Sequence, residues 1–249
     1  MDWPGILGLL AAGAVAGVLS SLFGIGGGIV LVPVLHYLLG FEWVEATQLS
    51  LVAIMVQSPT GVWQHARRGA VDWAVAFPLA MAGLLGVVIG DVLQPLVAVS
   101  WLKVLFATLM ALAAMRLAVP QPPPAPDARP LGRVGLYLLG LFAGIVAKLL
   151  GIGGGLVTVP VLALTGLPVH LAVGSSLVPV FTNAAVASGQ ALAHGLDWRP
   201  AVPLALGALA GVPLGAHWAH ALKEQGLRRV FAAGLALAAL YIGLTSGVV

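Results

Sequence analysis

The sequence GIGGG occurs twice, at residues 24–28 and 151–155, and each copy is followed five residues later by a proline, Pro33 or Pro160. Each glycine costs a helix about 1 kcal/mol relative to alanine, so four glycines in five positions predict a helix break. A break among apolar residues exposes backbone groups that lipid cannot pair, so protein, water or a ligand must supply partners. We therefore take these glycines as a candidate binding site: Gly24, Gly26, Gly27, Gly28, Gly151, Gly153, Gly154 and Gly155.

The composition around these stretches is that of a membrane protein. Hydrophobic residues make up 60% of the chain and charged residues 8%, whereas a soluble domain carries about a quarter charged residues. Long uncharged runs, such as residues 75–90 and 231–249, favour spanning helices over a barrel. The chain has no cysteine, so disulfides and thiolate chemistry are excluded. The predicted fold class is an all-α integral membrane protein.

The chain divides into two related halves. A proline-rich linker at residues 120–131 separates a first membrane repeat, residues 1–119, from a second, residues 132–249. The glycine stretches correspond at an offset of 127 residues, Ser50 and Gln57 correspond to Ser176 and Asn183 at 126, and Asp72 corresponds to Asp197 at 125. Each repeat holds about four apolar segments, which lie near residues 5–39, 46–66, 73–93, 98–118, 132–165, 171–193, 200–220 and 228–248.

The repeats are parallel if each glycine-containing segment crosses the membrane once, and inverted if each segment enters, breaks and returns. Basic residues mark the cytoplasmic side. The inverted arrangement leaves only Lys103 and Arg199 outside, and it places inside Arg67, Arg68, Arg116, Arg129, Arg133, Lys223, Arg228 and Arg229. The eight-span alternative splits these residues about evenly. Charge therefore favours the inverted repeat, with re-entrant first segments.

Polar residues recur every seven positions on the segment after each glycine stretch. Ser50, Gln57 and Gln64 form one series and Ser176, Asn183 and Gln190 the other. Because seven residues are nearly two helical turns, each series lines one helix face. The mid-span amides of Gln57 and Asn183 either hydrogen-bond between helices or face a cavity, where their N–H donors would hold an anion. Both readings stay open.

Lys148 is the one basic residue well inside an apolar run, three residues before Gly151. An ionisable group within the membrane suggests a functional site. Asp91 and Asp197 have the positions of span ends, so an anionic substrate is the expected partner of Lys148. Alternatively, the lysine extends to an interface.

Helices that restart after the glycines, at Ile29 and Leu156, would present free N–H groups and a positive dipole end to an anion. The alternative is that the glycines only allow close helix packing. Helix-packing seams are expected in any case at Gly83, Gly86, Gly90, Gly207, Gly211 and Gly215. Neither glycine stretch has the spacing of a phosphate-binding Walker loop or of a dinucleotide fold.

FGIGGGIVLVPVL and LGIGGGLVTVPVL, residues 23–35 and 150–162, resemble the motifs of the TauE/SafE sulfite exporter family, also described as sulfonate permeases. The resemblance covers both halves. It implies a carrier in the bacterial inner membrane that moves sulfite or small organosulfur anions, usually outward. It does not extend to Gln57, Asn183 or Lys148.

We therefore expect a secondary transporter for a small oxyanion, most simply sulfite or an organosulfonate, and not an enzyme. The alternative is a transporter or channel for another small anion such as a carboxylate. The expected partners are that anion and the lipid bilayer, and a homodimer is possible; no nucleic acid, cofactor or metal is expected. Because no carboxylate is expected in the membrane core, the membrane potential alone would drive export.

Overall fold

The computed structural model describes residues 3–23, 26–118, 131–221 and 224–245, which contain helices and no strand. This confirms the predicted all-α class. The helices match the expected apolar segments: α1 (Trp3–Phe23), α2 (Gly28–Pro33), α3 (Trp43–Arg67), α4 (Trp73–Leu93), α5 (Val99–Ala118), α6 (Arg133–Leu150), α7 (Gly155–Leu164), α8 (Val169–Ala193), α9 (Ala201–Ala221) and α10 (Glu224–Thr245). A π-helical turn, Val34–Leu38, continues α2, and a 3-10 turn, Gln94–Leu96, follows α4.

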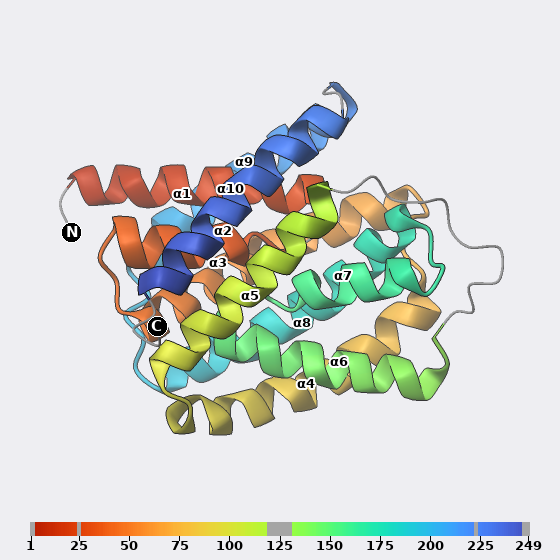
Figure 1. Cartoon of the computed structure of the whole chain (residues 1–249), viewed down its shortest axis with the longest axis horizontal. Helices are drawn as coiled ribbons and strands as arrows, with labels where there is room; N and C mark the ends of the chain where they lie inside the picture. Colours follow the sequence, from red (N-terminus) through yellow and green to blue (C-terminus); the bar gives the residue numbers. More distant parts are fainter. Residues whose placement is uncertain (1–2, 24–25, 119–130, 222–223, 246–249) are drawn as a thin grey trace.

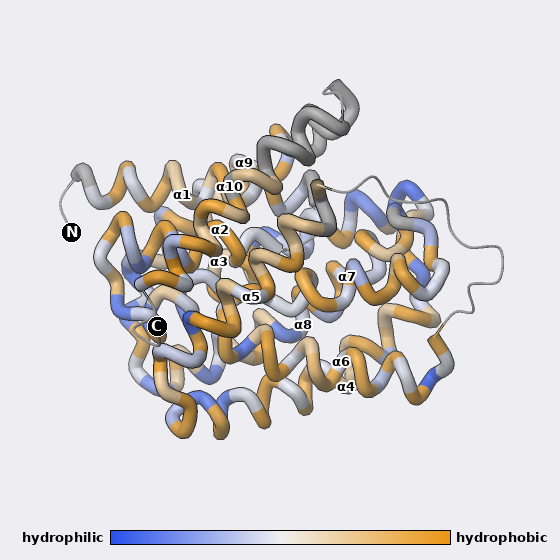
Figure 2. The backbone as a smooth tube through the Cα atoms, in the orientation of Figure 1, coloured by the Kyte–Doolittle hydropathy of each residue, from blue (hydrophilic) through white to orange (hydrophobic). Residues whose placement is uncertain are grey.

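The helices run between two polar ends of the molecule. Figure 2 shows apolar residues along the helices and polar residues gathered in the connecting loops at both ends. Among the described residues, three helical stretches have the length and hydropathy of a membrane span: Trp73–Leu96, Arg133–Leu150 and His170–Ala193. The linker at 120–131 and residues 24–25 lie outside the described residues, apart from Leu131.

Both glycine stretches break the helix, as predicted. Helix α1 ends at Phe23 and α2 begins at Gly28, while α6 ends at Leu150 and α7 begins at Gly155. The backbone turns through a left-handed conformation that side chains disfavour, with φ between 70° and 94° at Gly26, Gly27, Gly151, Gly153 and Gly154.

After each break the chain turns back along the helix it has just left. Gly27 lies beside the middle of α1, where a Cβ would come 2.9 Å from the Ala16 carbonyl oxygen. Gly154 lies in the same way beside Ala143 of α6, at 2.9 Å. In Figure 1, α1 begins and α10 ends on the left, whereas α6 begins on the right. The two short helices thus run antiparallel to the long helices that precede them.

Helices of the two halves interlock. Helix α1 packs against α9 and α4 against α6, while α3 packs against α8 and α5 against α10. Glycines form the first two contacts: a Cβ on Gly211 would lie 2.1 Å from a carbonyl oxygen of α1, and a Cβ on Gly86 would lie 2.1 Å from one of α6. The predicted glycine seams are confirmed, and the resulting frame holds α3 and α8 beside the two helix breaks.

Candidate functional site

The two glycine stretches touch each other, although more than 120 residues separate them in the sequence. A Cβ on Gly28 would lie 2.2 Å from the Gly151 carbonyl oxygen and 2.7 Å from the Cα of Ile152. Only glycine allows two backbones to approach so closely. The start of α2 therefore rests directly on the end of α6.

Both breaks close over the same two apolar side chains. A Cβ on Gly153 would lie 3.0 Å from Cγ1 of Val180 and 3.4 Å from Cγ2 of Ile54. The matching distances at Gly26 are 3.2 Å and 3.7 Å. Ile54 and Val180 are fully buried and lie between the breaks. Sequence reasoning missed them, although each precedes a mid-span amide by one helical turn.

Gln57 and Asn183 each hold the carbonyl of one break. The Gln57 amide nitrogen donates to the Gly26 oxygen at 2.8 Å, and the Asn183 amide nitrogen donates to the Gly153 oxygen at 3.4 Å. Of the two readings left open above, hydrogen bonding between segments is the one seen. The amide oxygens of both side chains are buried without a hydrogen-bond partner in the described structure.

The two serines of the polar series differ. Ser50 is buried and donates at 2.7 Å to the carbonyl oxygen of Gly151, so it ties α3 to the second break. Ser176 is also buried, but it donates to Val173 in its own helix. Gly24 lies outside the described residues.

The second short helix begins at the second break. The N–H groups of Val157 and Thr158 both donate to the Gly154 oxygen at 3.1 Å. Gly155 and Leu156, the first residues of α7, are buried. The first turn of α7 thus places backbone N–H groups at the positive end of the helix dipole.

Lys148 has a carboxylate partner, contrary to the sequence-based expectation. Its ammonium nitrogen lies 2.7 Å from Oδ1 of Asp91, and the lysine side chain is 1% exposed, so it does not extend to an interface. The helix seam explains the contact: Gly90 has no side chain, and a Cβ there would lie 2.9 Å from the Lys148 Cβ. Asp91, the next residue of α4, is thereby brought to the lysine.

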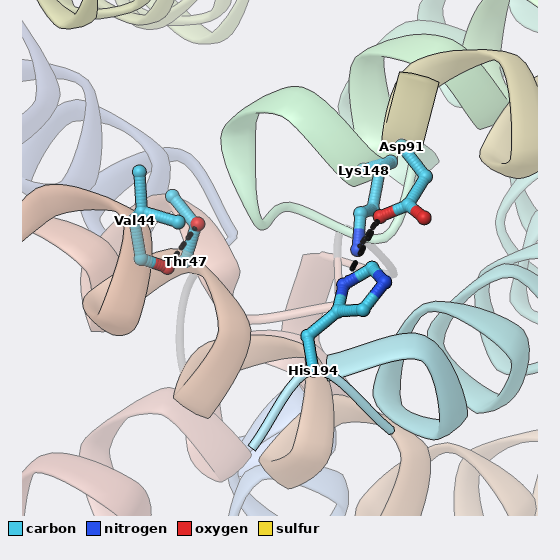
Figure 3. Close-up of polar contacts among 5 residues, drawn as sticks. All are labelled: Val44, Thr47, Asp91, Lys148 and His194. Carbon is cyan, nitrogen blue, oxygen red and sulfur yellow. Dashed lines mark hydrogen bonds and ion pairs between the residues drawn. The ribbon is translucent and has the colours of Figure 1, made fainter. Parts of the chain in front are cut away.

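His194 stands at the solvent side of this ion pair. Its Nδ1 lies 4.0 Å from the same Asp91 oxygen, and its side chain is 59% exposed. Figure 3 shows the three side chains converging from α4, α6 and the end of α8. The ammonium is an ion-pair partner only: no hydrogen bond of acceptable geometry reaches it in the described residues. Sequence reasoning missed this role of Asp91 and His194.

The family profile described as sulfite exporter TauE/SafE matches residues 9–242. A probable membrane transporter protein of Xylella fastidiosa is 29% identical over 242 residues, which are 94% of this chain and 93% of the relative. A probable membrane transporter protein of Haemophilus influenzae is 30% identical over 178 residues, which are 69% of this chain and 67% of the relative. No solved structure matches. The chain belongs to the TauE/SafE sulfite exporter family, whose similar members are named as membrane transporters.

Proposed function

We propose that the chain is a secondary transporter that exports a small oxyanion, sulfite or an organosulfonate, across the bacterial inner membrane by alternating access. The observation that carries this proposal is the meeting of the two helix breaks, where Gly26 and Gly153 close over the same pair of side chains. Many secondary transporters bind their substrate between repeats at broken helices. The family description as a sulfite exporter supports the class of anion.

The substrate site would lie between the two glycine stretches. The N–H groups at the start of α7 would donate to the anion, and Lys148, one turn before Gly151, would supply positive charge. Gln57 and Asn183 use one N–H each on the glycine carbonyls. Their second N–H groups would orient the anion, while Ser50 and Ser176 would line the approach along α3 and α8.

We propose further that residues 1–119 and 132–249 are inverted repeats joined by the linker. The reversal of the chain after each break supports this arrangement. The exchange of partners supports it too, since the first long helix of each half packs against the third long helix of the other half.

The second candidate is a transporter for another small anion, such as a carboxylate. Backbone N–H groups and a lysine would bind either kind of oxygen, so the geometry leaves the alternative in place. Binding can decide, because a ligand that binds only the folded protein raises its unfolding temperature. Purified protein would be heated with sulfite, sulfate, taurine, sulfoacetate and small carboxylates. We expect sulfite or a sulfonate to give the largest shift; a shift with carboxylates alone would favour the alternative.

A transport assay with a matched control would test the site. Proteoliposomes loaded with sulfite would carry the unaltered protein, Asn183→Leu or Gly189→Ala. Gly189 is an exposed helix glycine of α8 with open space where a Cβ would lie, so its variant should retain efflux. Asn183→Leu should lose most efflux while folding, because it removes the amide beside the break. Equal efflux from both variants would place the substrate elsewhere.

A further inference from the structure

We infer that Asp91 and Lys148 form a proton-coupling pair in which the substrate anion replaces Asp91 at the lysine and Asp91 then takes up a proton. This inference rests on the proposed function and adds the coupling ion to it. It departs from the expectation that potential alone drives transport, which assumed that no carboxylate lies near the site.

The lysine requires an anionic partner in every state. It is 1% exposed, and within the described part of the chain its one counter-charge is Asp91, at 2.7 Å. A buried charge without its partner is strongly unfavourable. Asp91 can therefore move away from Lys148 only when an anion that enters the site takes its place beside the ammonium. Lys148 precedes Gly151 by one helical turn, so the lysine belongs to the helix that ends at the break proposed to receive the anion.

The carboxylate is placed to exchange protons with solvent. Asp91 is 19% exposed, and His194, which is well exposed, has its Nδ1 4.0 Å from Oδ1 of Asp91. The two atoms are beyond hydrogen-bond distance, so the histidine would pass a proton between solvent and the carboxylate after the two side chains move into hydrogen-bond range. Two other ionisable residues near this end lie on helices packed against α6, namely Glu45 on α3 and Lys103 on α5. Neither forms an ion pair with Asp91 or Lys148 within 4.0 Å in the described residues.

The charges balance in each state. Before binding, Lys148 is positive and Asp91 negative, so the pair is neutral. After a monovalent anion binds, Lys148 is positive, the anion negative and Asp91 protonated, so the site is neutral again. One proton therefore binds with each monovalent anion, and the loaded carrier moves no net charge. Transport should then depend on pH on the two sides and be nearly insensitive to membrane potential. Because the proton leaves with the anion, the outward concentration gradient of the anion would drive net export.

The test measures proton uptake when purified protein binds an anion. Methanesulfonate is the main probe, because it stays a monoanion while the pH is varied, and sulfite is the second. Protein in weak buffer with a pH indicator would be mixed with each probe, and bound anion would be measured in parallel. We expect close to one proton per methanesulfonate for the unaltered protein. Asp91→Asn should bind the anion with no proton uptake.

The matched control is Asp197→Asn. Asp197 is an exposed acid in the loop between α8 and α9, 3.9 Å from Arg199, and its variant should keep the full proton uptake. His194→Asn should bind the anion equally but exchange the proton more slowly in stopped-flow mixing.

The outcomes separate the two proposals. If the unaltered protein binds methanesulfonate or sulfite without taking up protons, the coupling inference is overturned while the proposed function stands. If it binds neither anion, the proposed function is overturned and the inference with it. Proton uptake retained in a folded Asp91→Asn protein would assign the proton to another group. The measurement on the unaltered protein decides the question even if Asp91→Asn fails to fold.

Discussion

Substituting Gly28 by alanine should separate the two breaks. The added Cβ would lie 2.2 Å from the Gly151 oxygen, whereas ordinary contact begins at 3.4 Å. Both obstacles, this oxygen and the Cα of Ile152, belong to backbone that cannot rotate away as a side chain would. Overpacking in a well-packed core costs about 1–3 kcal/mol. We expect a loss of stability near ~3 kcal/mol, because the contact is with backbone.

Gly189→Ala is the control for helix propensity. Gly189 is also a helical glycine, but a Cβ there meets nothing within 4 Å, so alanine should stabilise α8 by about 1 kcal/mol. Unfolding of both variants would be followed in detergent by heating and by titration with a denaturing detergent. We expect Gly28→Ala to fall below the unaltered protein and Gly189→Ala to lie slightly above it. Equal stability of the two variants would contradict the close contact between Gly28 and the backbone of the second break.

Two further predictions follow from the amides and the loops. Gln57→Met should destabilise the protein by about 1–3 kcal/mol, because a buried carbonyl loses its hydrogen-bond donor. Asn183→Leu should destabilise it less, since the hydrogen bond of Asn183 is 3.4 Å long against 2.8 Å for Gln57. A larger loss of stability for Asn183→Leu in the same unfolding assay would contradict this ranking. The chain has no cysteine, so a single cysteine introduced at Trp198 or at Lys223 reports topology directly. A membrane-impermeant thiol reagent would be applied to whole cells. The inverted repeat predicts labelling at position 198 and none at position 223, and the eight-span alternative predicts the reverse.

The helix breaks and seams could be predicted from the sequence because they depend on local composition. Four glycines in five positions end a helix whatever surrounds them. Regularly spaced small residues mark a close helix contact in the same way. The element boundaries follow from the long apolar runs, which leave few places for a loop.

The ion pair could not be predicted, because it depends on how one helix is set along another. Asp91 ends α4 and Lys148 lies near the end of α6, and nothing in the sequence fixes the register between these helices. Gly90 sets that register by admitting the lysine stem. The partners of the two amides could not be predicted for a similar reason: a polar residue every seven positions gives the face of the helix, but not the group that lies opposite it.

The ion pair also makes the two ends of the molecule unequal. At the repeat offsets, Lys148 corresponds to Ser21 and Asp91 to Ala216, so the equivalent pair of positions carries neither charge. In a carrier built from inverted repeats, the two states of alternating access exchange the conformations of the halves. An ion pair present at one end only therefore stabilises the state in which α4 and α6 are closed together at that end. Because a ligand shifts a conformational equilibrium by its differential affinity for the two states, an anion that takes Lys148 from Asp91 would weaken that closed state. Substrate binding and opening of this end would then be the same event, driven by one exchange of partners at Lys148.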